Sequence, residues 1–162
     1  MSTEITVSHE CIALKSTYEN FIVSLEKVLN RLNPDWASGL KGDPELVRQH
    51  LITVAGNTGL MIFGQQAHGK LLGIKGKPGK VIQYLIGNPL TAVEMTQYDI
   101  RASLYAPLRV IFYEGDDRVL YVEYDLPSSL FGQFGKDEIS AVSKELDKKL
   151  LEVILLADGN AK

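Results

Sequence analysis

The chain has a single cysteine, Cys11, and this scarcity excludes an internal disulfide bond. The histidines, His9, His50 and His68, lie far apart in the sequence and show no metal-ligand spacing. Cys11 falls inside an expected strand, so we predict a small buried thiol without reactivity. We therefore expect no metal site, no cofactor and a reducing compartment.

Long apolar runs and an excess of positive charge are also absent. The most apolar stretch, LLEVILLA, is too short to span a bilayer. The N-terminal segment MSTEITVSHE has neither the basic start nor the apolar run of a signal peptide. The formal net charge is −3, whereas non-specific nucleic-acid binding requires a surface rich in Lys and Arg. We expect a cytoplasmic protein that binds neither membranes nor nucleic acid.

The composition that is present is that of a globular protein. Apolar residues make up 45% of the chain and charged residues 23%, which is ordinary for a soluble domain. A length of 162 residues fits one domain. We expect a single domain over residues 1–162, with its core at about residues 8–156 and short polar tails at both ends.

Hydrophobic periodicity predicts both helices and strands. Helices are expected at residues 16–32, where Ser16 and Glu19 match a capping box, at 43–56 and at 136–157. A short helix is expected after Asn88, its cap. The segments that read as strands are ECIALK, LMIFGQQ, KLLGIK, KVIQYLIG, LRVIFYE and RVLYVEYD.

The last two strands are predicted to form a hairpin with a two-residue turn at Asp116-Asp117. This turn places Arg109 opposite Tyr124, on the face that meets the helices. A guanidinium there costs too much free energy to stay unpaired. Stacking on the Tyr124 ring would provide a partner, as would Asp125 or Asp99. Two roles stay open for Arg109: an internal clamp, or an anchor for a carboxylate or phosphate ligand.

The run HGKLLGIKGKPGK is similar to a phosphate-binding loop, but it lacks the G-x-x-x-x-G-K-[ST] pattern. Its lysines are either solvated turn residues or a patch that attracts anions. His68 begins this run, and it is either a hydrogen-bonded turn residue or a general acid–base group near Arg109. Asn88 opens a helix whose free amides could hold an anion, although capping alone also explains it.

The segment YDLPSSLFGQFG carries Leu130, Phe131 and Phe134, which are too apolar for a plain connecting loop. In the helix that follows, an apolar arc extends past a single stripe. It includes Leu151, Leu155 and Leu156. Either the loop covers this helix as an intramolecular plug, or a second copy does. We expect a homodimer through this end of the helix, with the Phe131–Phe134 loop as a further candidate contact.

Four motifs, YLIGNPLTAVEM, LYAPLRV, YDLPSSLFGQFG and ELDKKL, occur in this order. Together they resemble the bacterial family called domain of unknown function 302, over roughly residues 60 to 155. The resemblance implies a TBP-like α+β fold, in which a curved antiparallel sheet has helices packed on one face. The helix at 43–56 looks like an addition to that layout. The family has no established activity, and a fold name does not imply DNA binding.

These observations favour a non-catalytic, homodimeric binding domain, either for a small ligand, with anions among the candidates, or for a protein partner. Arg109 would orient the ligand. The other candidate site residues are Tyr105, Tyr124, His68, Asn88, Asp125, Phe131 and Phe134. One alternative is an enzyme that uses His68 as general acid or base next to Arg109. Another is a purely structural interaction module.

Overall fold

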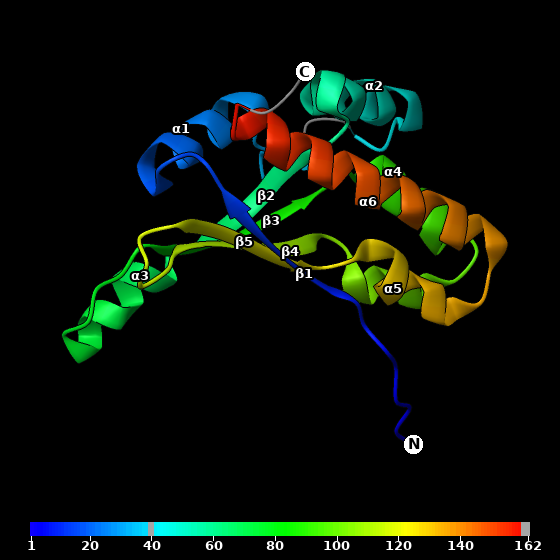
Figure 1. Ribbon diagram of the computed structural model, residues 1–162. Coiled ribbons are helices and arrows are strands. Elements are labelled where there is room, and N and C mark those ends of the chain that lie inside the picture. The colour runs from blue at the N-terminus through cyan, green and yellow to red at the C-terminus, as the bar shows by residue number, and fades with distance from the viewer. Residues whose placement is uncertain (39–40, 160–162) are drawn as a thin grey trace.

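The computed structural model describes residues 1–38 and 41–159, in which helices cover one face of a five-stranded sheet (Figure 1). The strands pair in the order β1-β5-β4-β3-β2, and every neighbouring pair is antiparallel. The expected α+β fold is confirmed. The strands are β1 (His9–Leu14), β2 (Met61–Gln66), β3 (Val81–Gly87), β4 (Leu108–Glu114) and β5 (Leu120–Asp125).

Helices lie between successive strands except between β4 and β5, which form a hairpin. The α-helices are α1 (Tyr18–Val28), α2 (Pro44–Ala55), α3 (His68–Leu71), α4 (Pro89–Thr96), α5 (Pro127–Phe131) and α6 (Asp137–Ala157). The short 3₁₀ helices are η2 (Gly56–Thr58), η3 (Leu72–Lys75), η4 (Ile100–Tyr105) and η5 (Gly132–Phe134). Within the described residues, no helix combines the length and the apolar character needed to cross a membrane.

Side-chain caps begin several helices. Asp43 accepts hydrogen bonds from the backbone N–H groups of Glu45 and Leu46, and Asn88 accepts one from Leu90, as the sequence predicted. The capping box at Ser16 is wrong, because Thr17 is the cap of α1. The backbone N–H of Ser16 instead donates to the Asp158 carboxylate at 2.8 Å. That contact ties the end of α6 to the junction of β1 and α1.

The main core lies between the sheet and the helical layer. Alternate side chains of β3, β4 and β5 point toward the helices, and burial alternates along these three strands. Phe21 of α1 packs against Phe112 of β4, with ring centroids 4.8 Å apart. The other core residues from the central strands and α6 include Tyr84, Ile86, Val110, Val122, Tyr124, Ile139, Leu150 and Ile154.

The predicted hairpin register is wrong by one residue. Val110 lies opposite Tyr124, and Phe112 lies opposite Val122. The cause is a three-residue loop, closed by a hydrogen bond from the Gly115 N–H to the Val119 carbonyl at 2.9 Å. Arg118 takes a left-handed conformation in this loop, with φ of 62°. Every β4 side chain therefore lies on the face opposite to the predicted one.

The predicted strand KLLGIK is also wrong. This segment forms α3 and η3, which extend beyond the end of the sheet between β2 and β3 (Figure 1). Its apolar side chains are solvent-exposed, with Ile74 at 81%. Lys80, at the end of the same excursion, forms ion pairs with Glu19 and Glu114, each at 2.9 Å. Lys80 is thus a paired structural residue.

The α3–η3 excursion closes on itself through Gly69, whose carbonyl accepts a hydrogen bond from the Gly79 N–H at 3.2 Å. A Cβ atom at Gly69 would lie 1.8 Å from the Gly79 carbonyl oxygen. We expect Gly69→Ala to lower the free energy of unfolding by roughly 1–3 kcal/mol, because two backbone segments must separate. Urea denaturation measures this loss.

Gly73→Ala is the matched control, because a Cβ at Gly73 meets no atom within 4 Å. This variant should stay within about 0.5 kcal/mol of wild type. Equal stability of the two variants would show that the close approach of Gly69 to Gly79 does not constrain the fold.

Candidate functional site

The face of the sheet that points away from the helices carries most of the polar side chains of β1, β4 and β5. His9 and Cys11 of β1 lie on it beside Glu123 and Asp125 of β5, because these residues are cross-strand partners. Arg109 lies on the same face of β4 and is exposed. The predicted position of Arg109 on the helix side is therefore wrong, and the register shift of β4 is the reason.

A groove of about 460 Å³ lies at one end of this face, and we call it the open-face groove. Two charged side chains, Arg109 and Asp125, line it, and its remaining walls are largely apolar. Leu85 comes from β3, Leu104 and Tyr105 from η4, and Leu130 from α5. The complete lining is Leu85, Leu104, Tyr105, Ala106, Pro107, Leu108, Arg109, Asp125 and Leu130.

The Arg109 guanidinium makes no ion pair or hydrogen bond with any residue that the structure describes. Tyr124, its expected stacking partner, lies on the opposite face with 4% of its surface exposed. Asp99 pairs with Arg101 instead, at 2.7 Å, and this hydrogen bond lowers the pKa of Asp99 to about 2. Asp125 pairs with His9 at 2.8 Å. Arg109 is thus a free cation on the groove wall.

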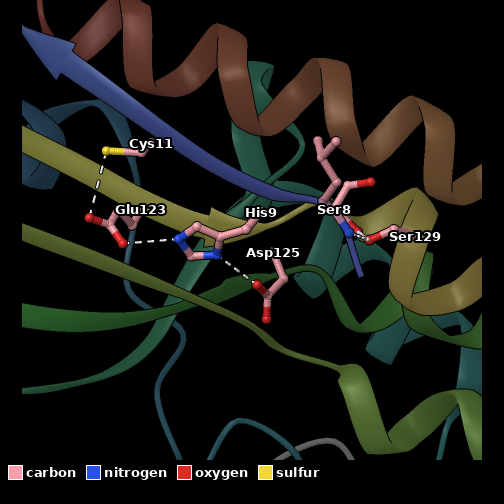
Figure 2. Close-up of polar contacts among 7 residues, drawn as sticks. Ser8, His9, Cys11, Glu123, Asp125 and Ser129 are labelled. Atoms are coloured by element: carbon pink, nitrogen blue, oxygen red, sulfur yellow. Dashed lines mark hydrogen bonds and ion pairs between the residues drawn. The ribbon is translucent and has the colours of Figure 1, made fainter. Parts of the chain in front are cut away.

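A hydrogen-bonded cluster adjoins the groove, and we call it the Glu123 cluster: His9, Cys11, Tyr113, Glu123 and Asp125. Figure 2 shows the His9 imidazole between two carboxylates, 2.9 Å from Glu123 and 2.8 Å from Asp125. The other Glu123 oxygen accepts hydrogen bonds from the Tyr113 hydroxyl and, at 3.6 Å, from the Cys11 thiol. Asp125 belongs to both the cluster and the groove.

These contacts shift the pKa values in a consistent way. The hydrogen bond to Asp125, followed by that to Glu123, raises the pKa of His9. Donation from Tyr113 and from His9 lowers the pKa of Glu123. The same bond to Glu123 raises the pKa of Tyr113 to about 12. The arrangement therefore favours an imidazolium between two carboxylates, with a neutral phenol alongside.

Cys11 is exposed, so the prediction of a buried thiol is wrong. The reason is the position of Cys11 on the uncovered face of β1. Partial desolvation and then the charge of Glu123 raise the pKa of the thiol, which disfavours the nucleophilic thiolate.

Within the described residues, no group of three or more His, Cys, Asp or Glu side chains could hold a metal ion.

The segment YDLPSSLFGQFG holds the groove's aromatic wall in place. Phe131 is 1% exposed, and its ring meets Tyr105 edge-on with centroids 6.1 Å apart. Phe134 also packs on Tyr105, at 6.3 Å, and the Arg101 guanidinium carbon lies 5.6 Å from the Phe134 ring centre. The Asp147 carboxylate accepts a hydrogen bond from the Ser128 N–H at 2.8 Å. Phe131 is thus an internal plug.

The structure brings three of the predicted site residues, Arg109, Tyr105 and Asp125, to one groove. Tyr124 lies in the core instead, and Asn88 and Phe131 line a different cavity on the helix side. His68 begins α3 and is not among the residues that line the groove. The predicted general acid–base group is therefore not combined with Arg109 in that groove.

His9 and Glu123 are the site residues that sequence reasoning missed. A signal was available in their spacing, because His9-x-Cys11 and Glu123-x-Asp125 each put two polar side chains on one face of a strand. The antiparallel pairing of β1 with β5 then brings the four side chains together. That pairing joins residues as far apart in the sequence as His9 and Asp125, which are 116 positions apart, and is not visible in local sequence.

The Glu123 cluster predicts a pH-dependent coupling between His9 and Glu123. A raised His9 pKa stabilises the fold fully below its ordinary value of 6.5, and this stabilisation is lost as pH rises through the folded-state pKa. A lowered Glu123 pKa stabilises above 4.5, and this is lost as pH falls. We expect the coupling energy from a His9→Gln and Glu123→Gln double-mutant cycle to at least halve between about pH 5.5 and about pH 8.5.

The Lys80–Glu19 ion pair is the matched control for this cycle. Hydrogen bonding to Glu114 and Glu19 raises the pKa of Lys80, and hydrogen bonding to Lys80 lowers that of Glu19, so both stay charged at both pH values. Its coupling, from Lys80→Met and Glu19→Gln, should not change. A His9–Glu123 coupling that is equally constant would mean that His9 does not titrate against these carboxylates.

Comparison with known proteins identifies relatives of this fold. A search of curated proteins finds no match to the chain. The fold is similar to the crystal structure of an uncharacterized conserved protein DUF302 from Bacillus stearothermophilus, with a TM-score of 0.66 and 13% sequence identity. The likeness covers 92% of this chain and 97% of that one. The family model of domain of unknown function DUF302 matches residues 38–156, and the chain therefore belongs to the DUF302 family.

Proposed function

We propose that the protein is a non-catalytic binding protein, whose open-face groove holds a small molecule with an anionic group and an apolar body. The observation that supports this most directly is the Arg109 guanidinium, which has no partner among the described residues and lies in a groove whose other lining residues are mostly apolar. A guanidinium is a planar donor that matches carboxylate and phosphate oxygens, and it is weakly hydrated. It can therefore exchange water for an anion at modest cost.

The hydrogen bonding of Asp125, the carboxylate next to Arg109 in the groove, also supports an anionic ligand. Asp125 also lines the groove, but its carboxylate is hydrogen-bonded to His9. When His9 is protonated, which its hydrogen bonds to Asp125 and Glu123 favour, its positive charge reduces the repulsion that Asp125 would exert on an anion. Leu85, Leu104 and Leu130 then offer contact area to an apolar chain or ring.

The chemistry of the adjoining groups favours binding over catalysis. The raised pKa of Cys11 keeps that side chain a thiol, and the Glu123 carboxylate already accepts bonds from three donors. A general base needs a free lone pair within reach of its substrate. His68, the acid–base group of the alternative enzyme hypothesis, lies in α3, outside the lining of the groove.

A homodimer through the end of α6 belongs to the same proposal. Leu151 and Leu156 are 37% and 43% exposed, while Leu155 is half-buried. Burying these side chains against a second copy would remove apolar surface from water, at about 25 cal/mol per Å². The exposed residues of η3, including Ile74, are one competing apolar surface.

The groove proposal predicts that decanoate, which combines a carboxylate with an apolar chain, binds the wild-type protein. Arg109→Met keeps the aliphatic stem and removes the charge. A hydrogen bond to a charged group contributes about 1.5–3 kcal/mol, so affinity by isothermal titration calorimetry should fall at least tenfold. The unfolding free energy should stay within about 0.5 kcal/mol, because Arg109 is exposed.

Arg48→Met on α2 is the matched control, because Arg48 is an exposed arginine outside the groove. It should bind decanoate as wild type does. Failure of the wild-type protein to bind decanoate, or equal binding by the two variants, would contradict the proposal. A large stability loss in Arg109→Met would favour the structural clamp instead.

The dimer proposal predicts a solution mass of twice the 17.9 kDa chain. The double variant Leu151→Ser/Leu156→Ser should shift light-scattering mass toward the monomer, whereas the control Ile74→Ser should not. A monomeric wild-type protein would refute the dimer. Dissociation by Ile74→Ser alone would place the interface on η3 and refute the α6 assignment.

A further inference from the structure

We infer a second binding site, for a small uncharged apolar molecule, in a cavity on the helix side of the sheet. This apolar cavity has a volume of about 270 Å³ and lies where α4 and α6 meet the ends of β3 and β4. Trp36, Phe63, Met95 and Phe131 supply its large walls. The other lining residues are Gly87, Asn88, Pro89, Thr91, Ala92, Ala106, Pro107, Leu108 and Leu146.

The charge of the ligand follows from this lining. None of the lining residues is charged. Of the polar residues, Asn88 is already engaged: its carbonyl oxygen accepts from the Leu90 N–H, and its amide donates to the Gly59 carbonyl, both at 2.9 Å. An ion that entered would lose its hydration without gaining a counter-charge, which costs several kcal/mol. The cavity therefore selects neutral molecules.

The size and stiffness of the cavity indicate a ring-sized ligand. An apolar cavity of roughly 150 Å³ suffices to hold benzene in an engineered protein core, so this volume accommodates a substituted monocyclic ring. Met95 and Phe131 are each 1% exposed, and Phe131 is held by the Tyr105 ring. Walls that are fixed by packing do not have to be ordered when a ligand enters, and this favours binding.

The apolar cavity is distinct from the open-face groove. The two share only Ala106, Pro107 and Leu108, which form a partition between them. Arg109 lines the groove and not the cavity. The inference therefore stands independently of the proposed function, and the two ligand classes differ in charge.

The chain carries its own reporter for this site, because its single tryptophan, Trp36, lines the cavity. Bromobenzene is a neutral ring whose heavy atom quenches tryptophan fluorescence on contact, and 4-bromobenzoate is its anionic counterpart. In the wild-type protein, quenching by bromobenzene should be saturable. Quenching by 4-bromobenzoate should require at least tenfold higher concentration.

Two variants localise the effect. Ala92→Phe projects a ring into the cavity and should abolish saturable quenching, while Arg109→Met should leave it unchanged. If Ala92→Phe does not fold, the methyl resonance of Met95 provides a second readout. In the wild-type protein this resonance should shift on addition of bromobenzene, and the dissociation constant from the shift should equal that from fluorescence quenching. Loss of decanoate binding in Arg109→Met has no bearing on this result.

The outcomes that overturn the inference are equally concrete. Linear, unsaturable quenching by bromobenzene would indicate collision with an exposed ring rather than a site. Equal quenching by 4-bromobenzoate would show that the cavity does not select against charge. Saturable quenching that persists in folded Ala92→Phe, or an unshifted Met95 resonance, would place the ligand elsewhere.

Discussion

The backbone hydrogen bond between Gly115 and Val119 closes a three-residue loop, and this closure decides which side of the sheet each β4 side chain occupies. Side chains alternate along a strand, so one residue more or less in the loop exchanges the two faces. With this register, Val110 and Phe112 enter the core and Arg109 faces away from it. The chemistry of the groove depends on that choice.

The helices cover one side of the sheet, and this explains how the polar side chains of the uncovered side are arranged. Helices bury one face, and the open face must satisfy its charges without them (Figure 1). The Glu123 cluster does so internally, through His9, Tyr113 and Cys11. Arg109 is the exception, since Asp125 pairs with His9 and Asp99 pairs with Arg101. Among the residues that the structure describes, Arg109 is thus a cation of this face without a side-chain partner, and apolar walls lie beside it.

Strong local signals made much of the fold predictable, and their absence explains the errors. Asp43-Pro44 and Asn88-Pro89 are unambiguous helix starts, and both helices form where expected. The β4 strand is apolar on both faces, so its pattern could not choose a register. The loop sequence did not indicate a three-residue loop either, because its left-handed position holds Arg118 instead of the usual glycine. Arg109, Tyr105 and Asp125 were still predicted as site residues, although Arg109 was expected on the face that meets the helices.

The segment between β5 and α6 connects the two cavities physically. Leu130 lines the open-face groove, and the next residue, Phe131, lines the apolar cavity, because successive residues of a short helix project in different directions. Asp147 of α6 holds this helix through the Ser128 N–H. Leu130 and Phe131 are therefore held by the same short helix, although they line different cavities. The apolarity of this loop therefore has a cause beyond core packing, since one short helical turn provides a wall to each of two cavities.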